Sequence, residues 1–446
     1  MNIYHQESQA ICLLEMSSKL LWKKRNGMNN TMLPGVKAIM IMLLLVIMTS
    51  FFTPLVHAAN LLFRSNLGSG ISLGSLYGYS TYGAWQAING TDKETGYTWP
   101  VSALGSNFSG IQLITVDPIT SSTIGNYISN EIRSVTGPKG TPVNELFQQV
   151  KIKGVVGTGG SQAPLVINRP WNIGDVNDLY ITYWFKYPAD FVNKLDNTVS
   201  TGNWRVQFEF KTGGYNNTYA GDYRIITNIV KDSDGKLYWK TDGDNMANGP
   251  WSKVLYWSEE NHAVPVPIDK WFKYEVYWHR SSGSDGRFWS AVNGQVIVDY
   301  HGPNVGDYNL PITRIMVNNP YSGGYATVES HSTGLQIWNG FPCGVEVSCF
   351  NYDTAPPTPP SSLAAKISKY STAAGVSLSW NVSADNIAVA GYNIYRNEIK
   401  IAVTTTNKYN DVLSGSAKGT LYKYTVKAFD AEDNLSAASS AALVTY

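Results

Sequence analysis

The feature that most constrains the fold is a long succession of short strand patterns between Leu61 and Pro342. Runs rich in Val, Ile, Tyr, Phe and Trp alternate with polar residues and are separated by Gly, Asn, Asp and Pro. No segment of this region keeps a 3.6-residue period, and the best helical candidate is the short stretch Asn144–Gln149. The pattern predicts an all-β domain.

The C-terminal part of the chain reads as a second unit. A chain of 446 residues is too long for one ordinary core. Residues 353–360 read Asp-Thr-Ala-Pro-Pro-Thr-Pro-Pro, which is typical of a stiff, extended linker. We therefore expect a large β-sandwich at 59–342, a disulfide loop and Pro-rich linker at 343–360, and a small module at 361–446.

Two strand patterns of the small module alternate strictly, so each places three apolar side chains on one face. The residues are Val376, Leu378 and Trp380 in the first strand, and Tyr422, Tyr424 and Val426 in the second. Together with Gly391–Arg396 and Asn434–Ser436, they make this segment resemble a fibronectin type III module. The resemblance implies an immunoglobulin-like sandwich that acts as a spacer or an adhesion unit.

The first 58 residues have the pattern of an export signal. Lys37 precedes the apolar run Ala38–Phe52, Pro54 ends the run, and Val56-His57-Ala58 matches a small-residue cleavage site. The run is short for a membrane span of roughly twenty residues. We expect cleavage after Ala58 and a secreted or surface-held protein; an uncleaved anchor is the alternative.

Composition argues against several classes of partner. The formal net charge is +1 and only 15% of residues are charged, so no long-range field would collect nucleic acid or anionic lipid. The sequence contains no phosphate loop, dinucleotide fingerprint or basic stripe. Aromatic residues make up 13% of the chain, an excess that could both build a sandwich core and stack on sugar rings.

Cys343 and Cys349 form the only cysteine pair after the expected cleavage site. They lie at the end of the large domain, and an exported chain permits a disulfide there. Two cysteines with no nearby histidine cannot make a structural zinc site.

The first group of candidate site residues lies on the predicted strand Trp204–Lys211. Strict alternation would place its apolar residues on one side and four polar residues on the other: Arg205, Gln207, Glu209 and Lys211. These side chains would form either a solvated outer face or a ligand-binding face. Arg and Lys suit a carboxylate, Gln suits a hydroxyl, and Glu suits a hydroxyl or acid–base work.

A second polar face lies on the predicted strand Trp271–Arg280 and comprises Lys273, Glu275, Tyr277 and His279. A Gly-rich turn then leads into the strand Arg287–Asn293, which contains Trp289. Asn293-Gly294 predicts a tight hairpin into Gln295–Asp299.

The segment from Trp271 to Gly302, followed by Leu335–Pro342, resembles the concanavalin A-like jelly roll of polysaccharide lyases (heparinase-like and alginate-lyase-like) and laminin-type lectin domains. In the lyases, Arg or Gln neutralises a uronate, His or Tyr takes the C5 proton, and Tyr protonates the leaving oxygen. The resemblance implies catalytic roles for Arg205, Gln207, Tyr277 and His279, and substrate binding by Glu209, Lys211, Lys273, Glu275 and Trp289. The Gln-x-His strand of those lyases is missing, as is the paired-carboxylate motif of hydrolases with this fold.

Three functions therefore stay open: an extracellular polysaccharide-recognising protein, a lyase acting on uronic-acid polymers, or a structural adhesion protein. Whether the protein is an enzyme is left open. Convergence of Arg205, Gln207, Tyr277 and His279 in one groove would favour an enzyme, and scatter onto outer faces would favour binding or scaffolding.

No cofactor follows with certainty from the residues, and no metal ligands are assigned. Asp232–Gly235 and Asp242–Asn245 resemble calcium loops, but neither has the downstream bidentate Glu of a helix–loop–helix site. Turn residues explain both segments. A structural Ca²⁺ stays an alternative, because it is frequent in this fold family.

Overall fold

The computed structural model describes residues 59–446 apart from residues 82, 116–117, 152–160, 170–175, 197–201, 214–222, 246–253, 307–308, 322–326, 344–348, 350–352, 354, 370–373 and 414–418. The predicted export signal, residues 1–58, lies outside the described residues. Within the described part of the chain, no helix is long and apolar enough to cross a membrane.

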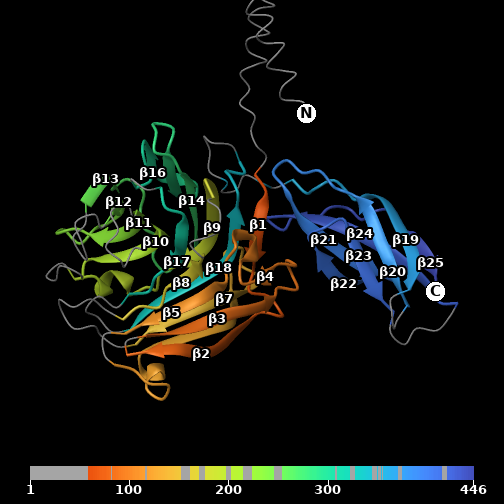
Figure 1. The fold of residues 1–446 in the computed structure, drawn as a ribbon, viewed down its shortest axis with the longest axis horizontal. Coiled ribbons are helices and arrows are strands. Elements are labelled where there is room, and N and C mark those ends of the chain that lie inside the picture. Colours follow the sequence, from red (N-terminus) through yellow and green to blue (C-terminus); the bar gives the residue numbers. More distant parts are fainter. Residues whose placement is uncertain are drawn as a thin grey trace, which may run out of the picture. The chain divides into compact units, whose positions relative to one another are not determined.

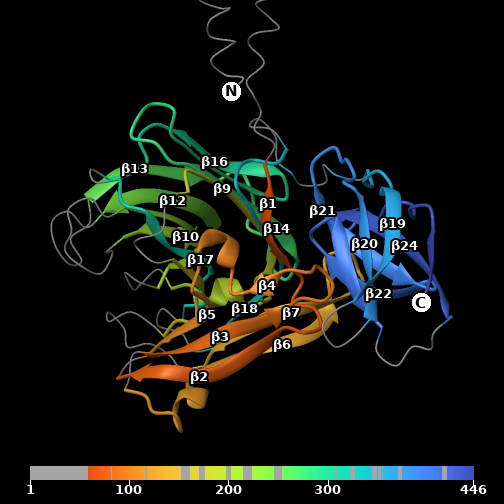
Figure 2. The same cartoon turned by 45° about the vertical axis from the view of Figure 1, so that its right-hand side comes forward.

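Two large antiparallel sheets form the first part of the molecule (Figures 1 and 2). The first is eight-stranded, and its neighbouring strands in order are β16 (Gln295–His301), β15 (Arg287–Val292), β14 (Phe272–His279), β9 (Asp178–Lys186), β18 (Val328–Trp338), β7 (Pro142–Val150) and β6 (Ile128–Thr136), with β1 (Leu61–Ser65) paired to β18.

The second sheet is ten-stranded. Its strands in order are β13 (Val254–Asn261), β12 (Leu237–Asn245), β11 (Arg224–Lys231), β10 (Trp204–Thr212), β17 (Ile312–Asn318), β8 (Leu165–Asn168), β5 (Phe108–Ile114), β3 (Gly83–Thr91) and β2 (Ser72–Ser80), with β4 (Thr98–Trp99) paired to β3. Short 3₁₀ turns occur at Ser102–Leu104, Ile124–Asn126 and Phe191–Lys194.

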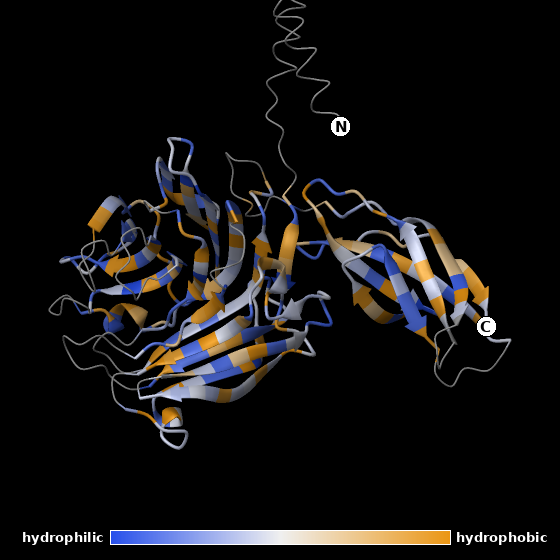
Figure 3. Cartoon of the chain, viewed as in Figure 1, coloured by the Kyte–Doolittle hydropathy of each residue, from blue (hydrophilic) through white to orange (hydrophobic). Residues whose placement is uncertain are grey.

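One hydrophobic core lies between these two sheets. It joins Phe208 and Phe210 of the ten-stranded sheet to Tyr274, Val276 and other residues of the eight-stranded sheet. Side chains point alternately to the two faces of a strand, so each sheet turns one side chain in two toward the other. Apolar and polar residues are interspersed along these strands (Figure 3). This arrangement is the all-β jelly-roll sandwich that the sequence predicts.

The C-terminal residues form a smaller sandwich. One sheet contains β19 (Ser361–Lys369), β20 (Ala374–Asn381) and β23 (Lys408–Val412); the other contains β22 (Ile399–Thr404), β21 (Val389–Arg396), β24 (Leu421–Asp430) and β25 (Ala442–Thr445). Their shared core includes all six side chains that alternation placed inside: Val376, Leu378, Trp380, Tyr422, Tyr424 and Val426. The immunoglobulin-like fold is therefore confirmed.

Two sequence expectations about local structure are wrong. The helical candidate Asn144–Gln149 lies inside β7, because pairing with β6 and β18 on both sides outweighs the helix propensity of Glu, Leu and Gln. Asp242–Asn245 is not a turn but the end of β12, paired with β11 and β13. Asp232–Gly235 does form the turn between β11 and β12.

The predicted disulfide is confirmed: Cys343 and Cys349 are bonded, with their Cα atoms 5.5 Å apart. The boundary between the two sandwiches at 343–360 stays a prediction.

Candidate functional site

A continuous row of side chains crosses six neighbouring strands of the ten-stranded sheet. Residues that oppose each other in antiparallel strands lie on the same face. Successive opposed pairs join Asp244, Arg224, Lys211, Arg314, Asn168 and Phe108, from β12 through β11, β10, β17 and β8 to β5. We call these six residues the cross-strand row. At about 4.8 Å between strands it spans roughly 24 Å.

The cross-strand row lies on the sheet face that points away from the core. Successive side chains of a strand point to opposite faces, so Lys211 points away from the face of Phe210, and Arg314 points away from the face of Ile315. Phe210 and Ile315 both belong to the core between the sheets. The cross-strand row therefore lies on the outward face of this sheet, where Arg224 and Asp244 are 8% and 3% exposed.

The middle of the row is a network of ion pairs. Lys211 Nζ lies 3.0 Å from Glu209 Oε1, and Arg224 Nη1 lies 3.6 Å from the same oxygen. Arg224 also forms a bidentate ion pair with Asp244, in which Nε lies 2.8 Å from Oδ1 and Nη2 donates to Oδ2. Arg314 Nη2 donates to Gln112 Oε1 from the next strand but one.

Burial changes the protonation behaviour of this network. Burial lowers the pKa of Lys211 to about 8, against the opposing pull of Glu209. Burial alone would raise the pKa of Glu209, but Lys211 and Arg224 outweigh it and hold that pKa below its ordinary value. Burial also lowers the pKa of Arg314. Lys211 is thus an amine that can lose its proton close to neutral pH.

Among the described residues, a buried donor and a buried acceptor on this face lack a hydrogen-bond partner. They are Nε of Arg314 and Oδ1 of Asn228, whose residue opposes Val206 on β10. A buried polar atom without a hydrogen bond lowers the free energy of unfolding by about 1–3 kcal/mol. A donor and an acceptor left open on one face indicate that a polar ligand or water completes it.

Aromatic rings continue the row at its far end. Phe108 packs edge-on against Trp85 at 5.0 Å and against Tyr77 at 6.3 Å between ring centroids. Tyr77 is 46% exposed, so its ring is accessible from solvent. The face therefore combines a charged centre with an accessible aromatic end.

The predicted site residues of β10 divide between the two faces of the sheet. Glu209 and Lys211 lie at the charged centre, whereas Arg205 and Gln207 face inward. The cause is a β-bulge: Val206 opposes Asn228 and Phe208 opposes Thr227, so Gln207 is an extra residue. The expectation that all four polar side chains share one face is wrong.

Both inward-facing residues are fully engaged with the protein. Gln207 donates to the hydroxyl of Tyr183 at 2.9 Å and accepts from that of Tyr187 at 2.7 Å. Arg205 donates to the main-chain oxygen of Gly202 at 3.1 Å and to that of Lys194. Neither side chain is more than 1% exposed, so neither can touch an external substrate in this fold.

The predicted residues of β14 lie on the other large sheet. Phe272, Tyr274, Val276 and Trp278 face the core, as alternation requires. The polar residues therefore point away from the core on the opposite side of the sandwich from the cross-strand row. Arg205, Gln207, Tyr277 and His279 do not converge in one groove.

On that opposite face, most of the predicted residues are covered by the chain itself. Lys273 Nζ pairs with Glu432 at 2.6 Å, and Glu275 accepts from the Tyr180 hydroxyl and from the Cys349 amide, both at 2.7 Å. Trp289 is 1% exposed and packs edge-on against Phe341. These residues hold the C-terminal segments against the sheet.

Tyr277 and His279 do meet, at Asp178. The Tyr277 hydroxyl donates to Asp178 Oδ1 at 2.6 Å, and His279 Nδ1 lies 2.8 Å from the same oxygen. Burial and this hydrogen bond raise the pKa of Tyr277 well above its ordinary value. A tyrosine held in this way is a poor base.

Sequence reasoning missed Arg224, Arg314, Asp244 and Asn168. Their strands do not alternate strictly between polar and apolar residues: Ile226 shares a face with Arg224 and Asn228, and Thr227 shares the other face with Ile225 and Ile229. Which strands neighbour β10 could not be read from the sequence either, because β17 follows β10 by about a hundred residues.

No family model matches the chain. Curated relatives match over 93 residues, 21% of this chain: chitinase Chi52 of Paenibacillus xylanexedens is 48% identical, and an alpha-amylase of Niallia circulans is 46% identical. That segment makes up 17% and 7% of those proteins, so the chain spans less than a fifth of their length.

Among solved structures, the neighbours include polysaccharide lyases. Alginate lyase Aly36B has a TM-score of 0.35 and 12% identity, covering 60% of this chain and 97% of the lyase. An endo-beta-1,4-glucuronan lyase from Trichoderma reesei has a TM-score of 0.36 and 10% identity, covering 49% and 92%. Likenesses this weak say nothing about the activity of this chain.

Proposed function

We propose that this protein binds an extracellular acidic polysaccharide on the outward face of its ten-stranded sheet. The observation that carries the proposal is the cross-strand row. Among the described residues, three basic side chains, Lys211, Arg224 and Arg314, gather there with two carboxylates, Glu209 and Asp244. Arg and Lys suit the carboxylate of a uronic acid.

The rest of the face suits a chain of sugar rings. Asn168 can bond hydroxyls, and the Phe108–Trp85–Tyr77 group offers rings for stacking. Neutral overall charge means that binding would depend on these local contacts instead of a general field. A 93-residue segment is similar to parts of a chitinase and an alpha-amylase, and this similarity supports the proposal that the protein binds a polysaccharide.

The first prediction concerns affinity. Lys211→Ala should weaken binding of a soluble polyuronate about tenfold to hundredfold, because a hydrogen bond to a charged group contributes about 1.5–3 kcal/mol. Isothermal titration with a polyuronate and with neutral glucan and chitin oligomers measures this. Lys366→Ala removes an exposed lysine of β19 and serves as the charge-matched control. Equal affinity of the two variants would contradict the proposed face.

A second candidate function, β-elimination, is favoured by the lowered pKa of Lys211. A neutral Lys211 amine could take the C5 proton of a uronate; the C4–O bond then breaks, a C4=C5 double bond forms, and the leaving oxygen takes a proton from water. Product would appear as the ultraviolet absorbance of an unsaturated uronate. The rate should rise as pH increases through about 8.

Lys211→Arg separates the two functions, because arginine keeps the positive charge but cannot act as a base. Loss of product with retained binding would support elimination by Lys211, and unchanged product formation would contradict it. Binding without product in the unaltered protein would leave a polysaccharide-binding protein. Failure to bind any glycan would favour the adhesion alternative.

A further inference from the structure

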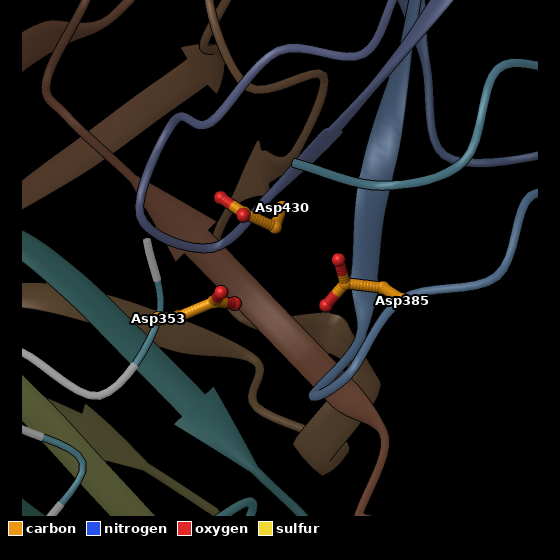
Figure 4. Close-up of side chains that lie close together, drawn as sticks. All are labelled: Asp353, Asp385 and Asp430. Atoms are coloured by element: carbon orange, nitrogen blue, oxygen red, sulfur yellow. The ribbon is translucent and has the colours of Figure 1, made fainter. Parts of the chain in front are cut away.

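Three aspartates from separate segments meet beside the small sandwich. Asp353 is the first residue of the Pro-rich stretch 353–360, Asp385 lies between β20 and β21, and Asp430 ends β24. One carboxylate oxygen from each lies within 4.8 Å of the others. Figure 4 shows the three side chains lying close together.

The cluster is largely buried and lacks a positive partner among the described residues. Asp430 is fully buried, Asp353 is 7% exposed and Asp385 is half-buried. Within the part of the chain that the structure describes, none of the three forms an ion pair with Lys, Arg or His. Three carboxylates held this close repel one another strongly unless a cation or a proton joins them.

Existing hydrogen bonds use only part of the oxygen capacity. Asp430 accepts from the amides of Glu432 and Asn434, both at 2.9 Å, and Asp385 Oδ2 accepts from the Ile387 amide at 2.9 Å. The other oxygen of Asp385, Oδ1, is buried and has no hydrogen-bond partner. A buried carboxylate oxygen without a donor is costly, so this oxygen points independently to a missing ligand.

We propose that Asp353, Asp385 and Asp430 bind one divalent cation, Ca²⁺. Hard oxygen ligands in irregular loops suit Ca²⁺, which accepts six to eight oxygens in flexible geometry, whereas Mg²⁺ demands a near-ideal octahedron. The absence of His and Cys from the trio argues against transition metals. Water and neighbouring amide oxygens would complete the coordination.

The site would tie the start of the linker to two loops of the small sandwich. Asn434 already donates to the main-chain oxygen of Asp353 at 3.1 Å, and Asn386 donates to its side chain at 3.2 Å. A bound cation adds a stronger link at the same point. This role is independent of polysaccharide binding on the ten-stranded sheet.

The experiment is calcium titration of the intact protein after treatment with a chelator. We expect one Ca²⁺ per chain by calorimetry, weaker binding of Mg²⁺, and a higher unfolding midpoint with Ca²⁺ because the folded state alone binds it. Absence of Ca²⁺ binding by the unaltered protein would overturn the proposal.

Asp385→Asn is the discriminating variant, since Oδ1 has no hydrogen-bond donor to lose. Without Ca²⁺ this variant should be at least as stable as the unaltered protein, because one repelling charge is removed. Addition of Ca²⁺ should not raise the unfolding midpoint of Asp385→Asn. Asp232→Asn, in the turn between β11 and β12, is the control and should bind normally. Normal Ca²⁺ binding by Asp385→Asn, or loss of Ca²⁺ binding by Asp232→Asn, would contradict the assignment.

Discussion

Lys211 illustrates how strongly one side chain depends on its surroundings. An exposed lysine keeps its proton to about pH 10.4. In this protein the side chain is only 14% exposed and lies 3.0 Å from Glu209, yet burial still lowers its pKa to about 8. The cost of removing the ammonium group from water exceeds the gain from its carboxylate partner.

This shift predicts a pH dependence of stability. The folded pKa of Lys211 lies below the unfolded value, so between about pH 8 and 10.4 the unfolded chain binds more protons. The Lys211 contribution to the unfolding free energy should therefore rise with pH in that range. Urea unfolding of the unaltered protein and of Lys211→Met at each pH gives the difference in unfolding free energy, in which the contribution of tyrosine titration cancels. If this difference is constant from pH 8 to 10, the pKa of Lys211 is not shifted.

At the scale of the element, the bulge in β10 decides which residues can reach a ligand. Without it, Gln207 would share the outward face with Glu209 and Lys211. With it, Gln207 turns inward and joins Tyr183 and Tyr187 in a buried hydrogen-bonded group. A residue that resembles a catalytic glutamine by position is thus a structural one.

Gln207→Leu tests this role. It should lower the free energy of unfolding by about 1–3 kcal/mol, because buried hydroxyls lose their partner. Polyuronate affinity should stay unchanged once the variant is folded. Denaturant unfolding and the same calorimetric titration measure both quantities. Gln295→Leu alters an exposed glutamine at the start of β16 and should change stability by less than about 0.5 kcal/mol. A selective loss of affinity in Gln207→Leu would restore it as a ligand contact.

At the scale of the whole molecule, the two sandwiches have separate cores but touch through a third cluster. That cluster joins Tyr277, Trp289 and Trp338 of the eight-stranded sheet to Ala431 of the small sandwich. Two ion pairs accompany it, Lys273–Glu432 and Arg64–Asp433, each at 2.6 Å. The outward face of β14 is therefore occupied by the protein itself.

Limited proteolysis tests whether the two sandwiches are separable. Cleavage within 343–360 should release a folded C-terminal piece beginning near residue 361, since its own core closes around Trp380 and Tyr424. Circular dichroism and the unfolding transition of the piece measure this. A piece that is unfolded after cleavage would show that the small sandwich depends on the third cluster.

Local patterns in the sequence determined several features of this protein. Alternation in Phe272–His279 and in Val376–Trp380 identified core faces, and Cys343 and Cys349, as the only cysteine pair after the expected cleavage site, predicted their own bond. Such features depend on neighbours in the chain, and side chains along a strand alternate whatever the fold.

Only the tertiary structure decided which polar side chains stand together. Lys211 meets Arg314 because β17 pairs with β10, and Asp385 meets Asp430 because two loops of the small sandwich converge. Long-range strand pairing follows from how whole faces pack, and a single inserted residue such as Gln207 reverses the direction of those before it. Neither effect leaves a local signal, so the charged centre and the aspartate cluster could be found only in the folded molecule.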